Sequence, residues 1–120
     1  MVLLGDPERT KQIYDLLYSL GVTANYKGFY YTAYAVCLCA QEPQKLMSVM
    51  KSVYPDVADY FGTNVRAVER LIRRTLQYVW EINPQRISKL FGREIDNRPK
   101  PVHFLAALTK EAFPTCLLEN

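Results

Sequence analysis

The chain has 120 residues, of which 49% are hydrophobic and 22% are charged. This composition excludes an intrinsically disordered chain, and the length suffices to bury one core without a metal or a disulfide. The sequence contains no run of 18 apolar residues and no basic leader followed by an apolar stretch. We therefore expect residues 1–120 to form a single soluble, cytoplasmic domain with no membrane partner.

The positive charges are concentrated in one part of the chain. The formal net charge is +3, but residues 1–65 carry a net −1, residues 66–100 carry a net +5, and the remainder carries a net −1. A local cationic excess of this kind is typical of a surface that binds a polyanion.

Apolar residues recur with helical periodicity along the whole chain, and no segment alternates as a strand does. The pattern predicts helices over residues 6–21, from 27 to about 40, from 42 toward 53, over 54–61, 64–81, 85–91 and 102–113. The segment 27–40 is apolar on nearly every face, so we expect it to be the buried central helix. The fold class predicted is all-α, a compact bundle of about six helices.

A tight turn is predicted between the helices at 54–61 and 64–81. Pro55 stands in the first turn of the former helix, where proline is tolerated. Gly62 follows its last turn and takes the left-handed conformation without steric cost, while Thr63 or Asn64 can cap the next helix.

The residues around this turn suit two helices that cross closely. Ala58 is small and lies four residues before Gly62, and the branched Val68 lies six residues after it. The spacing indicates a helix-turn-helix, in which the second helix enters the DNA major groove.

The second helix, about residues 64–81, has an apolar face and a polar face. The polar face holds Arg66, Glu69, Arg70, Arg73 and Gln77. Arginine can pair with guanine O6 and N7, glutamate can accept from cytosine N4, glutamine can pair with adenine, and each arginine can hold a phosphate. A solvated surface is the alternative for an isolated helix of this kind, but the preceding turn favours DNA recognition.

Several motifs together resemble a known family. They are Tyr54-Pro55-Asp56-Val57-Ala58, Phe61, Val68-Glu69-Arg70-x-Ile72-Arg73, Trp80 and Ile87-Ser88-x-Leu90-Phe91-Gly92, with Gly21-Val22 and Lys27-Gly28 upstream. This set resembles the C-terminal DNA-binding domain of the stage-zero sporulation response regulator A of endospore-forming bacteria, over roughly residues 14–107. The resemblance implies a six-helix effector domain that binds double-stranded DNA as a transcription regulator and ordinarily follows a phosphorylatable receiver domain.

The resemblance also implies roles for individual residues. Glu69, Arg70 and Arg73 match family positions that approach bases and backbone. The family usually has Ser-Arg before the Val of this motif and His after the later Arg, where this chain has Arg66-Ala67 and Arg74. Relative to the family pattern, the arginine before the Val stands one position earlier, at Arg66, which is about 100° around the helix. We expect Arg74 to contact a phosphate.

Two further partners follow as hypotheses. The short helix with Arg86 and Lys89 resembles the region through which the family engages the sigma subunit of RNA polymerase, and a second copy of the domain is expected in a tandem dimer on DNA. Arg98 and Lys100 suit either a flanking phosphate or plain solvent exposure. We expect no receiver domain in this chain, so it is either an excised effector domain or a stand-alone homologue.

Catalysis and metal binding have little support in the sequence. His103 is the only histidine, and no phosphate-binding glycine loop or nucleophile motif occurs. Cys37 and Cys39 are two residues apart on a predicted helix and point to different faces, so with Cys116 we expect them to be reduced structural thiols. We expect a non-enzyme without cofactor or metal; the alternative function is a protein interaction module on a degenerate helix-turn-helix.

Overall fold

A computed structural model describes residues 7–114 of the chain, and these residues form seven α-helices, one 3-10 helix and no strand. In order they are α1 (Pro7–Ser19), α2 (Lys27–Gln41), η1 (Pro43–Ser48), α3 (Val49–Ser52), α4 (Tyr54–Phe61), α5 (Val65–Ile82), α6 (Pro84–Phe91) and α7 (Pro101–Ala112). The predicted all-α class is confirmed. Asp6, where the first helix was predicted to begin, and the thiol Cys116 lie outside the described residues.

The third predicted helix is the one element that forms differently. Residues 43–52 divide into the 3-10 helix η1 and the four-residue α3, and Ser48 between them has a non-helical backbone (φ −156°, ψ 75°). Neither segment contains a buried residue, and Met47 is 89% exposed. Most helical stability in proteins comes from packing an apolar face, and this segment packs only the partly buried Leu46 and Val49 against the core, so little favours one regular helix here.

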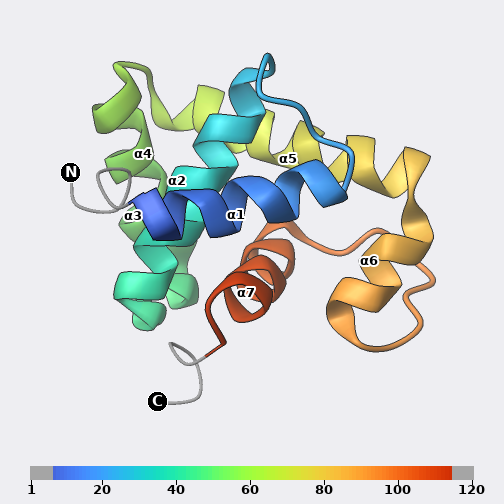
Figure 1. Cartoon of the computed structure of the whole chain (residues 1–120). Coiled ribbons are helices and arrows are strands. Elements are labelled where there is room, and N and C mark those ends of the chain that lie inside the picture. The colour runs from blue at the N-terminus through green and yellow to red at the C-terminus, as the bar shows by residue number, and fades with distance from the viewer. Residues whose placement is uncertain (1–6, 115–120) are drawn as a thin grey trace.

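Helix α2 is the centre of the molecule, as its composition predicts. Twelve of its 15 residues are buried, from Gly28 to Ala40. It contacts α1, α4, α5, α7 and η1. In Figure 1, α1 and α7 lie on the viewer's side of α2, and α5 crosses behind its upper end. One side of α5 therefore packs on the core while the other remains at the surface.

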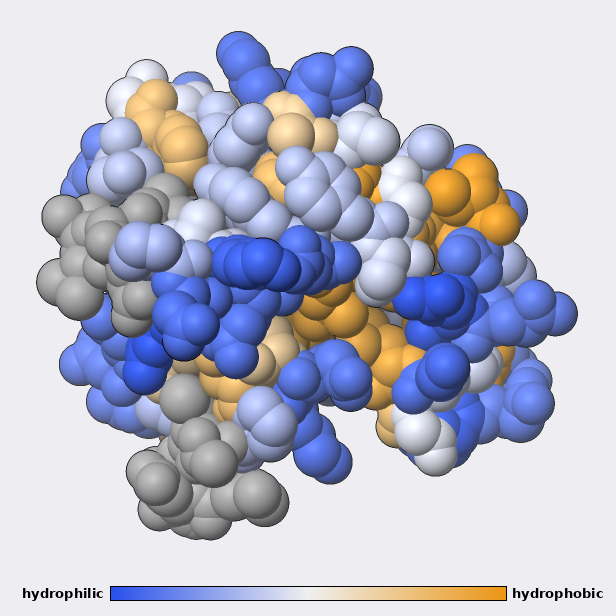
Figure 2. Space-filling model, viewed as in Figure 1, coloured by the Kyte–Doolittle hydropathy of each residue, from blue (hydrophilic) through white to orange (hydrophobic). Residues whose placement is uncertain are grey.

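The face of the molecule shown in Figure 2 is mostly hydrophilic, with scattered apolar areas. Figure 2 shows one such area in the angle between α1, α6 and α7. None of the helices in residues 7–114 is both long enough and apolar enough to span a membrane.

The two cysteines of α2 are enclosed in the core. The side chains of Cys37 and Cys39 are both 0% exposed. Burial raises the pKa of the Cys39 thiol to about 12, so this thiol stays protonated at neutral pH.

Helices α2 and α5 are in close contact at Gly28. A Cβ atom added there would overlap the Thr75 hydroxyl oxygen and the Tyr26 ring, and would lie 3.0 Å from the carbonyl oxygen of Leu71. The Thr75 hydroxyl donates a 2.8 Å hydrogen bond to the same Leu71 carbonyl, so the polar group at the crossing is satisfied within α5. Only glycine fits at this contact.

We predict that Gly28→Ala destabilises the domain, although alanine is the better helix former by about 1 kcal/mol. Overpacking against the backbone of α5 should cost about 1 to 3 kcal/mol of unfolding free energy, measured by urea denaturation. Thr75→Ala removes the nearest obstructing atom, so the double variant should lose less than the sum of the two single variants. Additive losses would mean that the two residues do not share this contact.

Candidate nucleic-acid interface

The turn between α4 and α5 has the geometry that its sequence predicts. Gly62 is left-handed (φ 68°, ψ 39°), and the Thr63 N–H donates to the Ala58 carbonyl at 2.9 Å, which closes α4. Asn64 is the N-cap of α5, because its side-chain oxygen accepts from the Ala67 N–H at 2.9 Å. The predicted start of the longest helix at Thr63 or Asn64 is therefore confirmed at Asn64.

The two helices pack through the residues expected at their crossing. Ala58 is 3% exposed, and Val68 and Ile72 of α5 are both 0% exposed. The small side chain on α4 permits the close approach, and the branched side chains of α5 fill the space between the helices and the core. This packing fixes which face of α5 is turned outward.

Lys45, a residue that the sequence did not single out, anchors the start of α4. Its ammonium group donates to the Ser52 carbonyl at 3.0 Å and lies 3.4 Å from both the Glu42 and Asp56 carboxylates. The Lys45 side chain is only 19% exposed. The contacts join η1, the end of α3 and the first turn of α4, so they restrain the position of the helix that precedes the turn.

The outward face of α5 carries two parallel rows of residues at spacings of four. The first row is Arg66, Arg70 and Arg74, and the second is Glu69, Arg73, Gln77 and Glu81. Residues four apart are neighbours on a helix surface, so each row runs along the helix axis. All six residues predicted for DNA contact lie in these rows, opposite the buried Val68, Ile72 and Leu76.

The second row is paired within itself. The Arg73 Nε donates to Glu69 Oε2 at 2.9 Å and its Nη2 to Glu69 Oε1 at 3.4 Å, while the Gln77 amide donates to Glu81 at 3.1 Å. Burial and, secondarily, the nearby Glu69 carboxylate raise the pKa of Tyr54 to about 12. Glu69 thus interacts electrostatically with both Arg73 and Tyr54, the first residue of α4.

The first row is unpaired. The side chains of Arg66, Arg70 and Arg74 make no hydrogen bond or ion pair with any other residue in the described range 7–114. Arg66 and Arg74 are exposed and Arg70 is half-buried. Three guanidinium groups in line, with no carboxylate to neutralise them, form a linear cationic surface suited to a polyanion.

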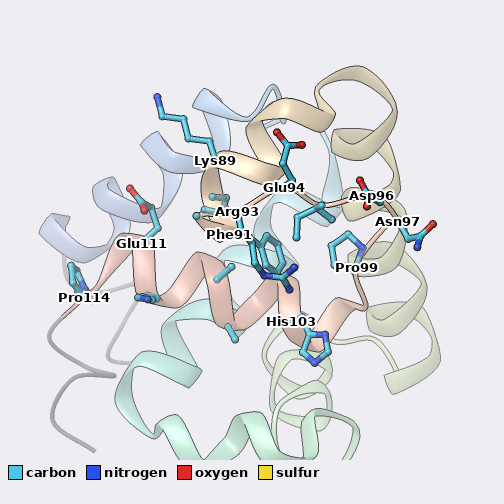
Figure 3. A pocket seen from close by; sticks show the side chains of 16 residues that line it. Lys89, Phe91, Arg93, Glu94, Asp96, Asn97, Pro99, His103, Glu111 and Pro114 are labelled. Atoms are coloured by element: carbon cyan, nitrogen blue, oxygen red, sulfur yellow. The ribbon is translucent and has the colours of Figure 1, made fainter.

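A second surface feature is a groove of about 1030 Å³ between α6, the 92–100 loop and α7. Figure 3 shows the Phe91 ring over α7, with Lys89 and Glu94 pointing outward. The loop is tied to α6 because the Ile95 N–H donates to the Ser88 hydroxyl at 3.0 Å. Lys89 is exposed at the rim, and the half-buried Arg86 does not line the groove.

Three other candidates from the sequence belong to the loop before α7 and to α7 itself, not to α5. Arg98 and Lys100 are exposed residues of the loop before α7 and have no ion-pair partner in the described range. His103 is exposed in the first turn of α7 and lines the groove. No side-chain hydrogen bond or ion pair joins these residues to the two rows on α5 within residues 7–114.

An all-α domain that presents an amphipathic cationic helix after a short glycine turn defines a helix-turn-helix domain of the transcription-regulator class. The family model described as sporulation initiation factor Spo0A C terminal matches residues 13–112, and the chain belongs to this family. The family is a DNA-binding transcription regulator domain of sporulation, so DNA is the ligand class of this chain.

We predict that Val68→Asp unfolds the domain or nearly so. An unpaired carboxylate between α4 and α5 should cost several kcal/mol, against a typical total stability of about 5 to 15 kcal/mol. The measurement is thermal unfolding followed by circular dichroism. Ile82→Asp is the matched control, because Ile82 lies on the same helix but is 53% exposed, and it should lose far less. Equal stability of the two variants would mean that α5 is wrongly phased.

Proposed function

We propose that this domain is a sequence-specific reader of double-stranded DNA that inserts α5 into the major groove. The observation that carries the proposal is the row of three unpaired arginines on the outward face of α5. Helix α5 follows a fixed turn and packs on the core. It therefore presents its arginines to the groove on a rigid element, unlike a flexible basic tail.

The proposed contacts divide by position along α5. Arg70 lies at the middle of the outward face in the first half of the helix, the half that approaches base edges in this motif, so we assign it to a guanine. Glu69, Arg73 and Gln77 lie beside it and reach the same groove. Arg66 and Arg74 stand at the two ends of the unpaired row, and we assign Arg74 to a phosphate.

The proposed unit of function is the single domain, acting in the cytoplasm where its DNA is found. We propose that two copies bind in tandem, because one exposed helix face covers only part of a turn of DNA. The alternative is a protein interaction module, which has its own support in the exposed Tyr78 and Ile82 on the second half of α5.

We predict that Arg70→Ala and Arg74→Ala have different effects on DNA affinity. Loss of a guanine contact in Arg70→Ala should cost about 1 to 3 kcal/mol on the preferred duplex and much less on a scrambled one. Loss of a phosphate contact in Arg74→Ala should weaken both duplexes equally and reduce the salt slope by about one unit. Titrations at several salt concentrations, on a duplex selected from random DNA, measure both effects.

Lys110→Ala is the control for these titrations, because it removes one exposed cation from the last turn of α7, outside the two rows on α5. It should leave both affinities nearly unchanged. If Arg70→Ala affects neither duplex, or weakens both equally, the assignment of this face to base recognition is wrong. Affinity that barely depends on salt would favour the interaction module instead.

We further propose that α6 contacts the sigma subunit of RNA polymerase through Arg86 and Lys89. Both cations lack an ion-pair partner in residues 7–114, and Lys89 stands at the rim of the groove that Phe91 lines. An exposed cation beside an apolar side chain suits an acidic, amphipathic partner segment.

We predict that Lys89→Glu weakens binding of the purified sigma subunit about three- to tenfold without changing DNA affinity, because it places like charges across the contact. Fluorescence anisotropy with a labelled sigma subunit measures the change. Lys110→Glu is the matched control, since it reverses the charge of another exposed lysine, on the α7 wall of the groove. An equal loss in both variants would indicate a general effect of charge rather than a contact by α6.

A further inference from the structure

The ion pair between Glu69 and Arg73 divides the outward face of α5 into free and restrained cations. Two N–H···O contacts of 2.9 and 3.4 Å join the guanidinium to both carboxylate oxygens. The Arg73 and Glu69 side chains are 45% and 31% exposed, so the pair is partly shielded and remains on the DNA-facing side. Arg66, Arg70 and Arg74 on the neighbouring row have no such partner.

This pairing has a direct consequence for binding to any duplex. To hold a phosphate through its Nε–H and Nη2–H groups, Arg73 must leave Glu69, and the freed carboxylate then faces the phosphates without a counter-charge. Both events oppose association, and both are independent of base sequence because every duplex carries the same backbone.

A particular arrangement of bases removes this penalty. The amino group at cytosine N4 donates to a carboxylate, and guanine O6 and N7 accept from a guanidinium. Where a cytosine amino group donates to Glu69 and a guanine edge or a phosphate accepts from Arg73, each residue replaces the lost ion pair with a new hydrogen bond to DNA. On other sequences one or both members lose a partner and gain none.

We propose that Glu69 is a specificity-determining residue that acts through Arg73, by withholding this arginine from the DNA backbone unless the bases offer replacement partners. The inference rests on the proposed function, since it requires α5 to lie in the major groove. Its consequence is that the carboxylate lowers affinity for random DNA more than it lowers affinity for the preferred site.

The test is a double-mutant cycle of Glu69→Gln and Arg73→Gln, titrated on the preferred and scrambled duplexes over a range of salt concentrations. Releasing one arginine to the phosphates should tighten Glu69→Gln binding to the scrambled duplex about three- to tenfold near 0.1 M salt, with a salt slope steeper by about 0.9. The gain on the preferred duplex should be smaller or absent, so the ratio of the two affinities falls. In the Arg73→Gln background, Glu69→Gln should lose this effect.

Glu81→Gln controls for long-range electrostatics. It removes the same charge from the same row, but Glu81 accepts from Gln77 rather than from an arginine. Any tightening that it causes is the part of the Glu69→Gln effect that needs no ion pair. Circular dichroism and thermal unfolding of each variant report whether the fold is retained.

Three results would overturn the inference. The first is unchanged affinity of Glu69→Gln for the scrambled duplex, and the second is tightening no greater than that of Glu81→Gln. The third is tightening that persists in the Arg73→Gln background, because the carboxylate would then repel DNA without using Arg73. If Arg70→Ala also leaves both duplexes unaffected, the proposed function itself fails; if Arg70→Ala reduces discrimination as predicted, only the role of Glu69 is rejected.

Discussion

The close contact of α2 and α5 at Gly28 is the constraint on which the rest of this structure depends. The missing side chain brings the backbone of α2 against the Leu71 carbonyl and Thr75, in the middle of α5. With the long helix fixed at that depth, Val68 and Ile72 become part of the core, and the residues about half a turn away must face outward. The orientation of the cationic face is therefore decided on the opposite side of the helix, in an interior contact.

Much of this architecture could be predicted because its signals are local. The left-handed Gly62, the capping Asn64 and the periodicity of α5 each depend on a few neighbouring residues, and the structure confirms them. The interruption at Ser48 depends instead on whether a segment finds an apolar surface to pack on. Tertiary packing decides that, and it is not written in the segment itself.

The place of the six proposed residues on the outward face of α5 was predictable, but their interactions with one another were not. All six residues proposed for DNA contact lie on the outward face, as the helical phase requires. The sequence interpretation gave Glu69 and Arg73 separate contacts with DNA, although their spacing of four already allows an ion pair between them. Lys45 was missed because it joins segments seven and eleven residues apart, through Ser52 and Asp56.

Charge alone is a poor measure of what such a surface does. The segment 66–100 has a net charge of +5. Of the four arginines of α5, however, Arg73 is paired with Glu69, and only Arg66, Arg70 and Arg74 have no carboxylate partner among residues 7–114. On our proposal, an arginine without a carboxylate partner raises affinity for all DNA. An arginine paired with a carboxylate raises affinity only where the DNA offers both members of the pair new partners. Discrimination is a difference between two affinities, so it benefits from a residue that weakens the wrong complex.

The junction of α5 and α6 joins the two proposed contact surfaces. Asn83 is the only residue between the helices: its N–H donates to the Val79 carbonyl at 2.8 Å, and its own carbonyl accepts from the Arg86 N–H at 3.0 Å. Ile87 anchors α6 in the same core that holds α5. A single residue bonded on both sides leaves little freedom for one helix to turn against the other. On our proposal, a partner held at Lys89 therefore stands at a fixed offset from the DNA groove, and the position of the DNA site determines where that partner is placed.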